Sequence, residues 1–128
     1  MYCLDTNIII DLFKKDKIVT AKMEKIKDLG FFISPVTLYE LYKGAYLSSR
    51  VSDNLNDIRS FLSSVELLDF DNLICESVGT EFSRLQNLGK IPQEFDLIIG
   101  VMAKINNLTL ITRNKKDFEN IDVKIEAW

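Results

Sequence analysis

The chain has 128 residues, 47% of them hydrophobic and 27% charged, with a net charge of −3, which is typical of one soluble globular domain spanning residues 1–128. It has no histidine, which excludes Ser-His-Asp and Cys-His catalysis and histidine-rich zinc sites. The mild acidity argues against a protein that coats DNA through many basic side chains.

No apolar run reaches the length of a membrane span, so we expect no membrane contact. Asp5 and Asp11 interrupt the first apolar stretch, which is therefore not a secretory signal. Cys3 and Cys75 both lie in predicted core elements and are expected to be free thiols. These features predict a cytoplasmic protein.

The first half of the chain alternates short apolar runs with helical patterns. Strands are predicted over about residues 2–5, 31–34 and 65–68. Helices are predicted over about residues 7–14, 18–29, 35–47 and 55–62, with a polar connection over 48–54. Thr6 or Asn7 is the expected N-cap of the first helix, Gly30 ends the second, and Pro35 opens the third.

The second half continues the same alternation. Helices are predicted over about residues 71–88, closed by Gly89, and 92–106, opened by Pro92 with Ile105 facing inward. A strand over 109–112, a short turn or helix over 114–120 and a weak strand over 123–125 follow. The whole pattern predicts an α/β fold with a mostly parallel sheet of four to five strands, covered by helices on both faces.

Two acidic residues lie close to predicted strand ends in the first half. Asp5 ends the first strand, and considered alone it is better explained as a helix cap. Glu40 lies one helical turn after the second strand, where Thr37 and Glu40 also match a capping box. Taken separately, neither residue establishes a functional site.

The second half adds two further positions. Asp96 has apolar neighbours, and Gly100 on the same helix face leaves room for a ligand to approach its carboxylate. A functional role is therefore slightly favoured for Asp96. Asn114 and Asp117 follow the 109–112 strand, where taken alone an ordinary turn with a helix cap is the better explanation.

The four positions together favour a different interpretation. In an open α/β sheet, sites form beyond the carboxyl ends of the strands, where these carboxylates would repel one another. A divalent cation resolves this conflict, and oxygen ligands without His or Cys select Mg²⁺ or Mn²⁺. Such a site activates water and offsets charge in a phosphoryl transition state. The residues therefore predict metal-assisted phosphodiester hydrolysis.

Four motifs and a terminal Trp128 also carry a family resemblance. The motifs are LDTN (4–7), SPVTLYELYKGA (34–45), FDLIIGVMA (95–103) and LITRNKKDF (110–118). In this order they resemble the PIN-domain ribonucleases of the VapC toxin type. The resemblance implies a PIN-like α/β/α sandwich and a Mg²⁺- or Mn²⁺-dependent endoribonuclease that cuts tRNA or another structured RNA. It also implies a VapB-like antitoxin as partner and a homodimer.

The resemblance also implies roles for individual residues. Asp5, Glu40 and Asp96 match the metal-binding acids, and the fourth acidic position falls on Asn114, with Asp117 three residues later. The residues expected to orient these acids are Thr6, Asn7, Thr112 and Asn114. The residues that either contact RNA phosphates or form a solvated basic turn are Arg113, Lys115 and Lys116.

Two alternatives remain at this point. A catalytically weak PIN-like module would only bind RNA or protein, and a phosphatase using Asp5 as nucleophile would need an acid where Asn7 stands. Leu12, Phe13 and the tyrosines of the 38–47 stretch are either core residues or a surface for the antitoxin or a second copy.

Overall fold

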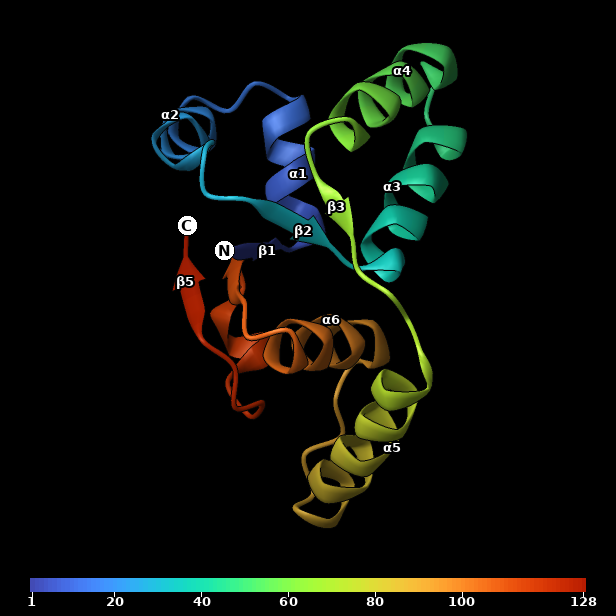
Figure 1. Cartoon of the computed structure of the whole chain (residues 1–128). Coiled ribbons are helices and arrows are strands. Elements are labelled where there is room, and N and C mark those ends of the chain that lie inside the picture. Colours follow the sequence, from blue (N-terminus) through green and yellow to red (C-terminus); the bar gives the residue numbers. More distant parts are fainter.

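The computed structural model describes residues 1–128 and contains one five-stranded, fully parallel sheet in the order β3-β2-β1-β4-β5 (Figure 1). The strands are β1 (Tyr2–Leu4), β2 (Phe31–Ile33), β3 (Glu66–Leu67), β4 (Thr109–Thr112) and β5 (Ile125–Ala127). Parallel strands need long crossovers, and the helices supply them.

The helices form a layer on each face of the sheet, as Figure 1 shows. One layer contains α1 (Thr6–Phe13), α2 (Lys17–Ile26), α3 (Pro35–Leu47) and α4 (Val51–Leu62). The other contains α5 (Asn72–Asn87), α6 (Glu94–Ile105) and the short 3₁₀ helix η1 (Lys115–Phe118). The predicted α/β/α sandwich is confirmed.

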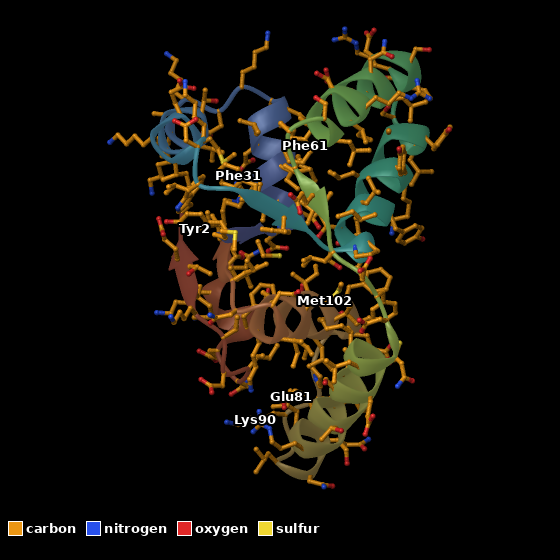
Figure 2. All side chains as sticks on the ribbon, in the orientation of Figure 1. Tyr2, Phe31, Phe61, Glu81, Lys90 and Met102 are labelled. Carbon is orange, nitrogen blue, oxygen red and sulfur yellow. The ribbon has the colours of Figure 1, made fainter.

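The central strands are apolar on both faces because each face has its own core. In β1, Cys3 packs in the cluster under α5 and α6, while Leu4 packs in the cluster under α1, α3 and α4. Figure 2 labels Met102 on the first side of the sheet and Phe31 and Phe61 on the second. Burial on both faces explains why these strands read as continuous apolar runs.

The strand order reverses direction beside β1. The chain steps from β1 to β2 and β3 under one helix layer, then returns to β4 on the other side of β1 under the second layer. Such a switch point opens a crevice at the carboxyl ends of the two strands. Asp5 directly follows β1, so the topology places it at this crevice.

Several helix ends differ from the prediction. Asp5 itself caps α1, in place of Thr6 or Asn7, and α2 ends at Ile26 rather than beside Gly30. Gly30 has a φ of +79° and its carbonyl accepts a hydrogen bond from the Tyr2 N–H at 3.2 Å, so it turns the chain into β2. The helix α6 begins at Glu94 with Gln93 as its N-cap, and Pro92 lies in the preceding loop.

The predicted connection over residues 48–54 is wrong in its second half, because α4 begins at Val51. The polar residues there form the solvent face of an amphipathic helix, and Arg50 and Asp53 form an ion pair at 2.7 Å across its first turn. Leu55, Ile58 and Phe61 face the core. The last strand lies two residues later than predicted, at Ile125–Ala127.

Two side chains expected in the core are exposed. Cys75 lies on the outer face of α5, and Ile105 is exposed at the end of α6. Both cysteines are free thiols, as expected, and burial followed by the nearby Asp5 raises the pKa of Cys3 to about 12. No helix combines the length and apolar character that a bilayer crossing requires.

Gly100 has a different role from the one predicted. A Cβ at this position would lie 2.8 Å from Ile121 Cδ1 and 3.3 Å from Phe118 Cδ1. The missing side chain therefore lets the η1 segment pack closely on α6, rather than leaving room for a ligand. Phe118 is fully buried against this helix, and the packing fixes the segment that carries Asp117.

The variant Phe118→Ala tests this packing. We expect a loss of about 3–5 kcal/mol in the free energy of unfolding, because a fully buried aromatic side chain leaves a cavity. Phe118→Leu, the matched control, should lose less because it retains most of the apolar volume. Urea denaturation of both variants measures the difference. Equal stability of the two variants would contradict the assigned packing.

Candidate active site

Asp5 is a buried acid at the switch-point crevice, with only 6% of its surface exposed. Its Oδ2 accepts a hydrogen bond from the Thr112 hydroxyl at 2.8 Å, and its Oδ1 accepts one from the Thr6 N–H at 2.8 Å. Its backbone N–H donates to the Ile111 carbonyl at 3.0 Å. The end of β4 and the start of α1 therefore hold this carboxylate in one orientation.

Glu40 is held from the same side. The Thr6 hydroxyl donates to Glu40 Oε1 at 2.8 Å and lies 3.2 Å from the Thr37 hydroxyl, which is fully buried. The predicted capping box is wrong, because the N-cap of α3 is Ser34, whose hydroxyl accepts a hydrogen bond from the Val36 N–H at 3.1 Å. Glu40 therefore does not cap α3. Its carboxylate is held beside the crevice by the hydrogen bond from Thr6.

Asp96, in the first turn of α6, completes a group of mutually repelling carboxylates. Burial, followed by the charges of Asp5, Asp117 and Glu40 in that order, raises its pKa to about 6. Burial also raises the pKa of Asp5, which the hydrogen bonds from Thr112 and Thr6 partly oppose. The four predicted acids therefore share one electrostatic environment.

Two residues, Asn114 and Asp117, are candidates for the fourth acidic position that the family resemblance implies. The exposed Asp117 on η1 acts on the pKa values of both Asp5 and Asp96. Asn114 contributes through its backbone, whose N–H donates to the Thr112 hydroxyl at 3.0 Å, while its side chain caps nothing. The electrostatics thus favour Asp117 as the fourth acid.

The three basic residues expected at RNA occupy different surroundings. Arg113 forms an ion pair with Asp11 at 2.7 Å, which ties the end of β4 to α1. Lys115 lines a depression away from the acids, beside Glu81. Only Lys116 lines a depression that also contains Asp96 and Asp117.

Asn7 is half-buried in the first turn of α1 and makes no hydrogen bond to Asp5, so the predicted orienting role rests on Thr6 and Thr112. Thr37 was missed as a site residue because its position in α3 also fits a helix cap. Lys90 was missed as well, because only the fold brings it beside Lys116. No three acidic side chains converge on one point in this arrangement.

The raised pKa of Asp96 predicts a pH-dependent contribution to stability in EDTA. The folded chain binds this proton more tightly than the unfolded chain, so the ionised carboxyl opposes folding above pH 6. Asp96→Asn should therefore be more stable than the unsubstituted chain at neutral pH, by about 1 kcal/mol after allowing for solvent screening. The difference should shrink as the pH falls below about 6 and become small near about 4, where the unfolded carboxyl is also protonated.

Thermal unfolding of both proteins in EDTA at several pH values measures this difference. Asp28→Asn, which removes an exposed acid in the turn after α2, is the matched control and should change little. A lower stability of Asp96→Asn at neutral pH would mean that the carboxylate makes favourable contacts, contrary to the assignment.

Comparison with known proteins gives a consistent result. The family model described as "PIN domain" matches residues 2–124. The chain is 30% identical over 128 residues to the "tRNA(fMet)-specific endonuclease VapC" of Shigella flexneri, covering 99% of this chain and 97% of that protein. It is 32% identical over 131 residues to "Ribonuclease VapC1" of Haemophilus influenzae strain R2866, covering 100% and 98%.

Solved structures of VapBC complexes have the same fold. VapBC2 from Rickettsia felis, bound to a promoter DNA fragment, matches with a TM-score of 0.90 at 29% identity, covering 99% of this chain and 98% of that one. VapBC-1 from nontypeable Haemophilus influenzae matches with a TM-score of 0.87 at 32% identity, covering 99% and 97%. With the carboxylate crevice described above, these matches show that the chain belongs to the PIN-domain family, in its VapC group.

Proposed function

We propose that this chain is a Mg²⁺-dependent endoribonuclease, with Mn²⁺ as an alternative ion, and the cytoplasmic toxin of a toxin–antitoxin pair. The VapC relatives named above as a ribonuclease and as a tRNA(fMet)-specific endonuclease support RNA, and structured tRNA in particular, as the substrate class. The observation that carries the proposal is the group of repelling carboxylates at the β1–β4 switch point.

The donor set fits a hard divalent cation. Asp5, Glu40 and Asp96 offer only oxygen ligands, and their mutual repulsion is the condition that a bound cation relieves. Mg²⁺ usually binds through one or two carboxylates and keeps several waters, so a closed cage of three acids is not required. When bound, the ion supplies an activated water and charge stabilisation for the phosphoryl group.

The protein contributes a rigid frame to this chemistry. Thr112 and Thr6 hold both oxygens of Asp5, so its ligand geometry is set before substrate arrives. The Thr6 hydroxyl holds Glu40 in the same frame. Asp117 adds negative charge that strengthens cation binding, and Lys116 offers a positive charge to a substrate phosphate. Preorganised groups of this kind cost no reorganisation during the reaction.

Asp5→Asn and Asp96→Asn test the assignment. Each variant should fold and lose cleavage of a tRNA pool in Mg²⁺ by about 100-fold or more, as expected when a principal charge of a preorganised site is removed. Asp28→Asn is again the matched control and should cleave normally. Circular dichroism verifies folding, and gel analysis of the RNA measures cleavage. Full Mg²⁺-dependent cleavage by either variant would refute the site.

EDTA and end mapping test the reaction class. Chelation should abolish cleavage, added Mg²⁺ or Mn²⁺ should restore it, and the products should carry 5′-phosphate and 3′-hydroxyl ends, because water attacks phosphorus and the 3′ oxygen leaves. A generic phosphomonoester should remain intact. RNA binding without cleavage in either metal would favour the alternative, a PIN-like binding module.

Two partners belong to the proposal. A cavity of about 300 Å³ between α1, α3 and α4 is lined by Ile10, Phe13 and Leu41 and reaches Glu40, which suits an apolar segment of a VapB-like antitoxin. Tyr46 and Leu47 are exposed on α3 and suit a homodimer face. The VapBC structures named above support the first partner. Phe13 also packs edge-on against Phe61 at 5.7 Å, so part of its ring belongs to the core.

A further inference from the structure

A groove crosses the candidate active site above Asp96. Two surface depressions, of about 400 and 590 Å³, share Asp96 and the loop residues Ile91, Pro92 and Gln93 as part of their walls. The shared residues make the two depressions neighbours, and we call them together the groove. Glu40 lies in one part and Asp117 in the other, so the groove exposes three of the proposed acids, while Asp5 is buried and lines neither part.

The two ends of the groove differ in chemistry. The end beyond Asp117 contains Lys116 and Lys90, and Figure 2 labels Lys90 close to the C-terminal end of α5. Lys90 Nζ donates to Asn120 Oδ1 at 3.2 Å, which holds its charge at this end. The opposite end contains Phe95, which is 42% exposed. One end therefore suits a phosphate and the other a flat apolar group.

Phe95 belongs to an aromatic pair that joins α6 to α3. The rings of Tyr39 and Phe95 pack edge to face, with centroids 6.0 Å apart and an interplanar angle of 87°. Phe95 lines the same depression as Glu40 and Asp96, so this ring lies near two of the proposed catalytic acids. The edge-to-face contact with Tyr39 fixes the orientation of the Phe95 ring, and part of that ring stays exposed.

The order of groups along the groove matches single-stranded RNA. Such a strand presents phosphates and flat base faces at regular intervals, and proteins bind it through cations and exposed aromatic rings. A duplex hides its base faces and could not use Phe95. Lys43, whose Nζ lies 5.6 Å from the Tyr39 ring centroid, adds a positive charge near the aromatic end.

We propose that Phe95, braced by Tyr39, stacks an unpaired nucleobase of the RNA substrate, while Lys116 and Lys90 bind a phosphate on the other side of Asp96. This assignment rests on the proposed nuclease function and defines its substrate as a strand that is unpaired at the cut. Phe95 is then a residue that selects unpaired RNA, separate from the acids that promote hydrolysis.

The test uses single-stranded RNA carrying 2-aminopurine, with Mg²⁺ present and the Asp5→Asn variant as background to prevent cleavage. Phe95→Ala should weaken binding by about 5- to 100-fold and abolish the fluorescence quenching that stacking causes. Phe95→Trp should retain both, because it keeps a stacking face. Phe70→Ala, which removes an exposed aromatic ring in the loop between β3 and α5, is the matched control and should bind normally.

Three further measurements complete the design. Mn²⁺ binding, followed by electron paramagnetic resonance in the otherwise unsubstituted chain, should be the same with and without Phe95→Ala. Lys116→Ala should reduce the salt dependence of RNA binding by about 0.7 in the logarithmic slope, as expected for one lost phosphate contact to a single strand. A fully paired RNA of the same sequence should bind with equal affinity to the protein with and without the Phe95→Ala substitution.

Unchanged RNA affinity and quenching in Phe95→Ala would overturn the stacking site. So would conversion of a dimer to a monomer by Phe95→Ala or Tyr39→Ala with RNA binding intact, because the aromatic pair would then be an interface between copies. Absence of cleavage by the unsubstituted chain would contradict the nuclease function itself, and the binding assay separates this failure because it requires no cleavage.

Discussion

The burial of Asp5 at the β1–β4 switch point is the constraint on which the rest of the site depends. Hydrogen bonds to a charged carboxylate contribute about 1.5–3 kcal/mol each, and Asp5 accepts two. Desolvating the charge costs several kcal/mol, so the two effects nearly cancel, and the raised pKa shows that burial prevails. The fold therefore keeps a buried carboxylate at Asp5 whose negative charge no nearby cation neutralises.

The surrounding structure adds further negative charge near Asp5. The loop before α6 brings Asp96 close, the packing of Phe118 on Gly100 brings Asp117 close, and neither approach introduces a compensating cation at Asp5. Arg113, the nearest basic residue in sequence to Thr112, is turned away into an ion pair with Asp11. The repelling carboxylates lower the free energy of unfolding and keep the crevice electronegative. Such an arrangement is typical of functional sites.

The sequence predicted which acids gather at the switch point, because there the local pattern and the topology coincide. Asp5, taken alone, is better explained as a helix cap, and it was recognisable as a candidate only together with Asp96, because the strand ends of a parallel sheet meet on one edge. The features that sequence reasoning missed depend on contacts between distant segments. The role of Gly100 could be recognised only by knowing that η1 packs on α6. The role of Thr37 depends on its contact with Thr6, which lies 31 residues earlier in the sequence.

The amide at position 114 illustrates how one local change fits the same design. The Asn114 backbone N–H donates to Thr112, which in turn donates to Asp5, so this position supports the first acid without a side-chain charge. The following 3₁₀ turn then brings Asp117 within electrostatic reach of Asp5 and Asp96. A single acid at position 114 would have to position Thr112 and also supply a negative charge. Here Asn114 does the first and Asp117 the second. The negative charge around Asp5 and Asp96 is therefore kept with an amide at position 114, because the packed turn beyond it brings Asp117 close.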